Sequence, residues 1–132
     1  MSIDAIMEAS RAGLAYERLR MEAASKNIAA ANMPLAPNAM PTRAEVMNNP
    51  VAFNQFVGGD LVEVKQGNTA TRAVHDPGHP MADAQGMVHY PATDLVQEMT
   101  TLMTASRGYE ANVRAFNLLR GMTMKAIEIG AK

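Results

Sequence analysis

Apolar residues recur at alternating spacings of four and three along the N-terminal part of the chain. This is the repeat of a coiled-coil seam on one face of a helix, and it predicts a helix from about Ile3 to Ala31. The following Asn32-Met33-Pro34 is expected to end it, because a residue before proline is disfavoured in the helical region. The seam positions are Ile3, Met7, Ser10, Leu14, Glu17, Met21, Ala24, Ile28 and Ala31, and Glu17 is the one charged residue among them.

A second helix is predicted after Pro91, with Thr93 or Asp94 as its N-cap. Gly130 is expected to end this helix as a C-terminal glycine. Gly108 and Gly121 weaken a helix interior, so each suggests a place where another backbone comes close. The seam runs Leu95, Met99, Leu102, Ser106, Tyr109, Val113, Phe116 and, after a three-residue step typical of a stammer, Leu119, Met122, Ala126 and Ile129.

All seven prolines lie between Pro34 and Pro91, so the middle of the chain cannot form a long helix. Alternating residues predict a strand over Asp60–Gln66, and two further segments, Thr69–Val74 and Met87–Tyr90, are expected to pair with it. The segment Met33–Asn54 has no clear period and is expected to be loop. Pro77, Gly78, His79 and Pro80 belong to a predicted structural turn, which Asp76-Pro77-Gly78-His79 would form as type II.

The predicted fold class is mainly α: an antiparallel, coiled-coil-like pair of long N- and C-terminal helices with a small β/loop insertion at one tip. Residues 1–32 and 93–132 are expected to form one discontinuous helical assembly domain, and residues 33–92 the Pro- and Gly-rich insertion. Two helices cannot hide both seams and also the apolar residues away from them, so the remaining apolar surface predicts neighbouring molecules. The residues away from the seams are Leu19, Leu118, Met124 and Ile127.

The composition indicates that apolar side chains are buried by association with other molecules more than in a thick core of the single chain. Apolar residues make up 48% of the chain, but there is no Trp and only 3 Phe and 3 Tyr, whereas 12 residues are Met. Methionine adapts to irregular neighbours and is common on surfaces that repack against partners. The seams are therefore either the internal core of the pair or a seam between subunits, and the shortage of aromatic residues favours the second interpretation.

Charge and cysteine content exclude several classes of protein. The 13 acidic and 12 basic residues nearly balance and form no basic stripe, so nucleic-acid binding is not indicated. The absence of cysteine excludes disulfides and thiolate sites. The first residues contain no basic region or apolar run of signal-peptide length, and no stretch is apolar enough to span a bilayer. If the protein leaves the cytoplasm, we expect an export pathway that recognises a signal other than a secretory signal peptide.

Candidate catalytic and metal-binding residues have ordinary structural explanations. His75, His79 and His89 fall close together, but no pair has the spacing that places two ligands on one helix face. Asp76 and Asp83 flank the same turn and are expected to cap it. Ser106 has no nearby histidine, and Gly58-Gly59 lacks the Lys-Ser/Thr of a phosphate-binding loop. We therefore expect no enzymatic activity, no cofactor and no metal.

Two stretches resemble the flagellar axial proteins of the rod and hook. Residues 10–34 contain Gly-Leu, Arg-Leu and Asn-Ile-Ala in the order of that family's N-terminal signature. Residues 76–129 contain Asp-Pro-Gly-His-Pro-Met-Ala-Asp and then Ala-Ser-Arg-Gly-Tyr-Glu-Ala-Asn-Val, which is similar to the C-terminal half of proximal rod proteins of the family. The chain departs from the N-terminal signature at Ala30, Met33 and Leu35, where the family has Asn, Thr and Gly.

The resemblance implies a structural subunit of the bacterial basal-body rod, a helical tube that crosses the periplasm and transmits torque. It implies export through the flagellar type III apparatus without a cleaved signal peptide. The implied partners are other copies of the chain and the rod components FlgB, FliE and FlgF, with no nucleic acid and no membrane span. Two other classes stay open on the residues alone: a cytoplasmic coiled-coil adaptor and a small His-dependent metal enzyme.

The seams and the matched motif positions together define the predicted assembly interface. Its residues are Ile3, Met7, Leu14, Met21, Ala24, Asn27, Ile28, Asn32, Leu95, Met99, Leu102, Ser106, Arg107, Tyr109, Asn112, Val113, Phe116, Leu119, Met122 and Ile129.

Overall fold

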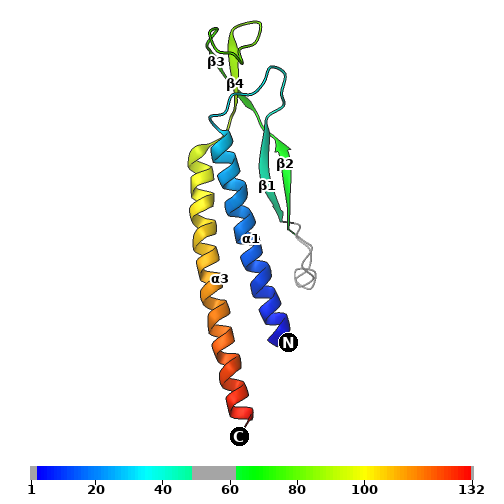
Figure 1. The fold of residues 1–132 in the computed structure, drawn as a ribbon, viewed down its shortest axis with the longest axis vertical. Helices are drawn as coiled ribbons and strands as arrows, with labels where there is room; N and C mark the ends of the chain where they lie inside the picture. The colour runs from blue at the N-terminus through cyan, green and yellow to red at the C-terminus, as the bar shows by residue number, and fades with distance from the viewer. Residues whose placement is uncertain (1–2, 49–61, 132) are drawn as a thin grey trace.

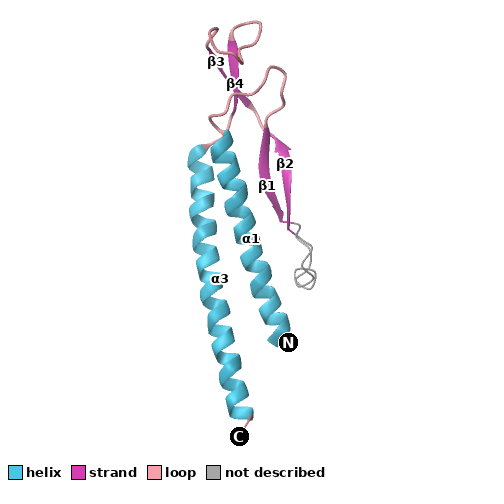
Figure 2. Cartoon of the chain, in the orientation of Figure 1, coloured by secondary structure: helices cyan, strands magenta, loops and turns pink. Residues whose placement is uncertain are grey.

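Two long helices lie side by side and run in opposite directions (Figure 1). The computed structural model describes residues 3–48 and 62–131. The N-terminal helix is α1 (Ile3–Ala30) and the C-terminal helix is α3 (Leu95–Gly130). This confirms the mainly helical fold with a small antiparallel β insertion between the helices in sequence, while coiled-coil geometry stays a prediction. Figure 2 shows how little of the chain is strand.

Local signals in the sequence account for the end of α1 and for the start of α3. Helix α1 ends at Ala30, shortly before Pro34. Asp94 is the N-cap of α3, and its carboxylate accepts hydrogen bonds from the backbone N–H groups of Val96 and Gln97. Helix α3 ends at Gly130, the residue predicted to end it, but the glycine does not form a left-handed cap: Gly130 is still helical, and the C-cap, Ala131, keeps a right-handed conformation with φ −91°.

The first hairpin pairs β1 (Thr42–Asn48) with β2 (Val62–Asn68), in a register that places Val46 opposite Val64. Strand β1 lies alongside α1, on the side away from α3, so this hairpin is not at the tip of the pair (Figure 1). The prediction that Met33–Asn54 is loop is therefore wrong for β1. The sequence of β1, Thr-Arg-Ala-Glu-Val-Met-Asn, contains too few apolar residues to show a clear period of two. Residues 60 and 61 of the predicted first strand lie outside the described residues, as do Gly58 and Gly59.

The second hairpin pairs β3 (Thr71–His75) with β4 (Met87–Pro91) beyond the ends of the helices (Figure 1). These two strands pair with each other, so the expectation that both would pair with the segment now seen as β2 is wrong. A bridge between Leu35 and His89 ties β4 to the segment that follows α1. The backbone N–H of Leu35 donates to the carbonyl of His89 at 2.8 Å.

The predicted turn at Pro77 is present, but it is not type II. The N–H of His79 donates to the carbonyl of Asp76 at 3.2 Å, which closes the turn. A type II turn requires positive φ at Gly78, and among the described glycines only Gly86 has it, with φ 74°. Gly86 precedes β4, and its N–H donates to the carbonyl of Asp83 at 3.0 Å. The left-handed residue therefore lies at the end of the β3–β4 connection instead of its start.

The core is thin and consists mainly of small residues. Of the described residues, the buried hydrophobic ones are Ala23, Ala24, Ala31, Val88 and Ala105. Alanine at these positions lets the helices approach closely but buries little apolar area per residue. The single chain consequently leaves many large apolar side chains exposed.

Candidate assembly surface

At two places along the contact between α1 and α3, a glycine of one helix faces a polar side chain of the other. A methyl group added at Gly108 would lie 2.8 Å from Cδ of Glu17, and one added at Gly13 would lie 3.1 Å from Nδ2 of Asn112. Glu17, the charged residue in the predicted seam, thus lies across Gly108, and its Oε2 is 3.0 Å from Nη1 of Arg20. Gly108 marks a close approach as predicted, but the neighbour is a side chain and not a backbone. Gly121 has no neighbour of this kind within 4 Å.

The predicted interface residues divide between the helix–helix contact and the solvent. Those buried or half-buried in the single chain are Met7, Leu14, Met21, Ala24, Asn27, Ile28, Leu102, Ser106, Asn112, Val113, Phe116 and Leu119. Those exposed are Asn32, Leu95, Met99, Arg107, Tyr109, Met122 and Ile129, while Ile3 begins α1. The seams therefore serve partly as internal core, and the exposed members are left as the predicted surface for other molecules.

Asn27, chosen because it lies in the Asn-Ile-Ala motif, binds strand β1 of its own chain. Its Nδ2 donates to the carbonyl of Ala44 at 2.9 Å, and its Oδ1 accepts from the N–H of Ala44 at 2.8 Å. The buried side-chain amide of Asn27 thus pairs with both the N–H and the carbonyl of Ala44, as the backbone of a neighbouring strand would. Since Ala44 pairs with Gln66 in β2, Asn27 connects the whole hairpin to α1.

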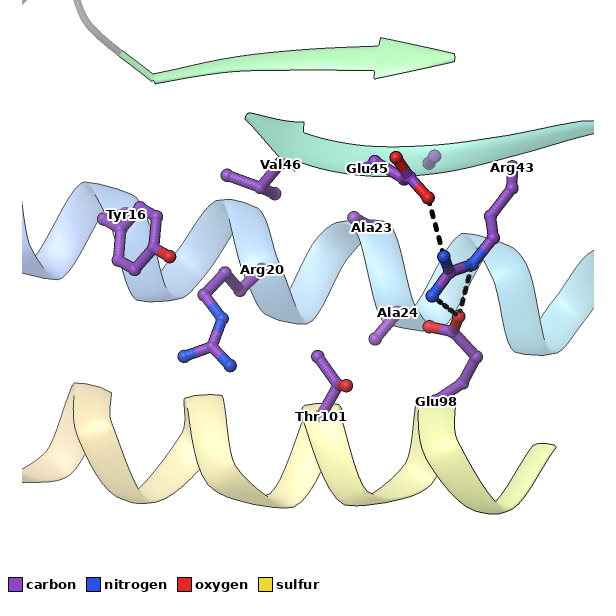
Figure 3. A pocket seen from close by; sticks show the side chains of 10 residues that line it. Tyr16, Arg20, Ala23, Ala24, Arg43, Glu45, Val46, Glu98 and Thr101 are labelled. Atoms are coloured by element: carbon purple, nitrogen blue, oxygen red, sulfur yellow. Dashed lines mark hydrogen bonds and ion pairs between the residues drawn. The ribbon is translucent and has the colours of Figure 1, made fainter. Parts of the chain in front are cut away.

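A second attachment joins β1 to α3. Arg43 donates from Nε and Nη2 to Oε1 of Glu98, at 2.8 and 2.6 Å, and from Nη1 to Glu45 at 2.7 Å. Glu98 is only 3% exposed, so its charge requires this partner. The hydrogen bond from Arg43 to Glu98 raises the pKa of Arg43, against the opposing effect of burial. Figure 3 shows the guanidinium of Arg43 lying between the two carboxylates.

Pattern analysis missed Glu98 as an important residue. Its partner lies 55 positions away, in a segment whose sequence predicts a loop. A glutamate one turn into a helix otherwise resembles an ordinary exposed residue that favours the positive end of the helix dipole. No local signal in the sequence distinguishes the two cases.

A cavity of about 230 Å³ lies between α1, β1 and α3 (Figure 3). Arg43, Glu45 and Glu98 line it and pair with one another, and Arg20 lies over the ring of Tyr16 at 5.7 Å from its centre. Charged groups that neutralise each other in this way hold neighbouring elements together. The cavity is therefore part of the junction between the hairpin and the helices.

Two of the three histidines take part in local hydrogen bonds near the β3–β4 turn. The Nδ1 atom of His79 accepts from the N–H of Met81 at 3.0 Å, and Nε2 of His89 lies 2.9 Å from Oδ2 of Asp83. Within residues 3–48 and 62–131, no group of three or more His, Cys, Asp or Glu residues is arranged to hold a metal ion.

Asp83 caps a turn as predicted, but it is the turn that leads into β4 and not the one at Pro77 and Gly78. Its Oδ1 accepts from the N–H groups of Gln85 and Met87, each at 2.9 Å. The hydrogen bond from Met87, followed by that from His89, lowers the pKa of the Asp83 carboxyl. This carboxylate thereby organises the turn from Asp83 to Met87 that leads into β4, whereas the turn of Pro77, Gly78, His79 and Pro80 is closed by the backbone hydrogen bond from His79 to Asp76.

In the part of the chain that the structure describes, no helix has the length and apolar character needed to cross a membrane.

Comparison with known proteins places both helices in one family. Residues 84–129, which include β4 and most of α3, match the C-terminal family model of the flagellar basal body rod FlgEFG proteins. The chain is 33% identical over 133 residues to the flagellar basal-body rod protein FlgC of Salmonella typhimurium, covering 98% of this chain and 99% of that protein. FlgC of Escherichia coli O157:H7 is 32% identical with the same coverage. FlgC of Bacillus subtilis is 29% identical over 143 residues, covering 94% and 95%.

Proposed function

Because this chain belongs to the FlgC family of flagellar basal-body rod proteins, a family of structural rod components, we propose that it polymerises through the exposed residues of its terminal helices. The protein is a structural subunit of the rod. The tube that it helps to build crosses the periplasm and transmits torque. The alternative of a cytoplasmic coiled-coil adaptor is not favoured, since the similarity extends over nearly the whole chain.

The observation that carries this proposal is the large apolar surface that α3 leaves exposed. Val96 is 74% exposed, Leu118 67% and Ile129 78%, and Met99, Met103 and Met122 are also exposed. A soluble monomer seldom exposes so many large apolar side chains on one helix unless another molecule covers them. Methionine and branched side chains on a helix are suited to packing against other helices.

The two parts of the chain have different roles in this proposal. Residues 1–32 and 93–132 form the discontinuous assembly domain, and residues 33–92 form the insertion that Asn27 and Arg43 attach to it. The partners are other copies of the chain, then FlgB, FliE and FlgF. In this proposal the flagellar type III apparatus exports the chain to the basal body.

Substitution of exposed helix residues tests the proposal without disturbing the chain's own core. Met99→Lys and Ile129→Lys should each abolish swimming and remove the chain from purified basal bodies, because a lysine would be buried in the interface. Met40→Lys is the matched control, since Met40 is 78% exposed but lies outside the helices. Normal motility of both helix variants would show that the exposed α3 residues do not form the assembly surface.

A further inference from the structure

Helices α1 and α3 carry the same short arrangement of a glycine and a longer polar residue. On α1, Glu17 follows Gly13 by four residues, and on α3, Asn112 follows Gly108 by four residues. Residues four apart lie on one face of a helix, about one turn from each other. Each helix therefore presents a gap and, one turn further along the chain, a polar side chain.

The two antiparallel helices fit these arrangements into each other. A methyl group added at Gly13 would lie 3.1 Å from Nδ2 of Asn112, and one added at Gly108 would lie 2.8 Å from Cδ of Glu17. The side chain of Glu17 is only 15% exposed in this position. Each polar side chain thus occupies the space that the glycine of the opposite helix leaves.

A shift of one helix along the other by one turn destroys this fit in either direction. In one direction Gly13 would face Gly108, and the space between them would stay empty because neither has a side chain. In the other direction Glu17 would face Asn112, so that two long side chains would meet without a gap beside either. Of these three alignments, the observed one alone fills both gaps.

The apolar residues of the contact distinguish the possible alignments less sharply. The observed alignment continues towards both ends of the contact, where Ile6 and Leu119 line one cavity and Ala24 and Thr101 line another. Because apolar residues recur at heptad spacing on both helices, a shift by one heptad would again bring them together. Such a shift would move both polar side chains away from the glycines. Polar residues within a helix seam are a well-attested means of fixing its register.

We propose that these two glycines and two polar residues form a register lock, which selects one alignment of α1 and α3 and thereby positions the β1–β2 hairpin. Arg43 and Ala44 are adjacent in β1, and they bind Glu98 on α3 and Asn27 on α1. A slip of one turn would displace Glu98 from Asn27 by about 6 Å along the helices. Adjacent residues of one strand could then not reach both anchors. The register lock acts within a single chain, so this inference goes beyond the proposed function and does not depend on it.

A distance between two labels on different helices measures the alignment directly. The natural chain contains no cysteine, so Lys26→Cys/Arg114→Cys accepts one nitroxide label on each helix. Both side chains are exposed. In the observed alignment the two positions lie about 22 Å apart along the helices, and a slip of one turn would change the distance between the labels by about 5 Å. Pulsed electron paramagnetic resonance of the purified full chain should give one narrow distance.

An exchange of residues across the contact tests the fit without changing the composition. Gly13→Asn places two asparagines opposite each other, so it should displace or broaden the distance and accelerate hydrogen exchange of the Ala44 amide. Gly13→Asn/Asn112→Gly returns one glycine and one asparagine to the same place, and it should restore both measurements. Gly121→Asn is the matched control, because no atom lies within 4 Å of a methyl group added at Gly121.

The double variant decides the outcome even if Gly13→Asn fails to fold. Recovery of the narrow distance supports the register lock, and failure to recover it overturns the proposal. An unchanged distance in Gly13→Asn also overturns it, even with a lower Tm, because the contact would then contribute packing without selecting the alignment. A displaced distance with unchanged exchange at Ala44 would show that the alignment does not position the hairpin.

Discussion

Arg43 on β1 and Glu98 on α3 form a two-point ion pair between segments far apart in the sequence, with N–O distances of 2.8 and 2.6 Å to one carboxylate oxygen. The carboxylate is almost completely buried. The pair and the Asn27–Ala44 hydrogen bonds hold the β1–β2 hairpin against the helices. The following predictions concern these contacts and the turn at Asp83.

Removing Arg43 should strongly destabilise the chain. Arg43→Met leaves the Glu98 carboxylate buried without its partner, which typically costs about 3–5 kcal/mol. The free energy of unfolding of the purified full chain, from urea titration, measures the loss. Arg43→Met/Glu98→Met should recover most of it, because both charges are then absent. If the double variant is no more stable than Arg43→Met, the loss does not arise from the unpaired carboxylate.

Asn27→Ala should release β1 from α1 without unfolding the helices. The N–H and carbonyl of Ala44 would lose their side-chain partner, at a cost of about 1–3 kcal/mol if they stay buried. Hydrogen exchange of the Ala44 amide should accelerate, while amides in the middle of α3 should keep their protection. Asn32→Ala is the control, because Asn32 is exposed. Unchanged exchange at Ala44 in the Asn27 variant would contradict the proposed attachment.

Alanine at Gly121 should stabilise the isolated chain more than alanine at Gly108. Either change should gain about 1 kcal/mol of helix propensity. At Gly108 the new methyl group meets the Glu17 side chain at 2.8 Å, so the gain is offset, whereas Gly121 has open space around it. Thermal unfolding of the two variants gives the comparison. An equal rise in Tm for both would mean that Glu17 moves aside without cost.

The β3–β4 connection should loosen in acid. The folded-state pKa of Asp83 is lowered by the hydrogen bonds from Met87 and His89. Its contribution to stability is therefore fully present above the ordinary aspartate pKa of about 3.9, and it is lost as the pH falls through the lowered value. Amide chemical shifts of Gln85 and Met87, followed by NMR from pH 7 downward, should report the change.

Asp83→Asn separates the charge from the hydrogen-bond acceptor. The amide oxygen still accepts from the N–H groups of Gln85 and Met87, so the turn should persist at neutral pH but lose its acid transition. Asp76→Asn is the control, since the turn uses the backbone carbonyl of Asp76. An acid transition that survives in Asp83→Asn must come from another group.

The sequence by itself determined the elements that local rules control. The heptad-like spacing gave both long helices, Pro34 ended the first of them, and Asp94 capped the second. The Asp83 turn also followed from residues close together in the chain. In each case the interacting groups lie within a few positions of one another, so their pattern is visible without the fold.

Only the tertiary structure decided where the β1–β2 hairpin lies and which residues hold it. Strand β1 is attached by side chains of Asn27 and Glu98, which lie 17 and 55 positions from their partners. Only Ala44 and Val46 alternate with polar residues in this strand, which is too short a pattern to distinguish its sequence from a loop. The sequence also did not determine which seam residues are internal and which are exposed. That division depends on how closely Gly108 and Ala105 allow the helices to approach, and on how far α3 extends past α1.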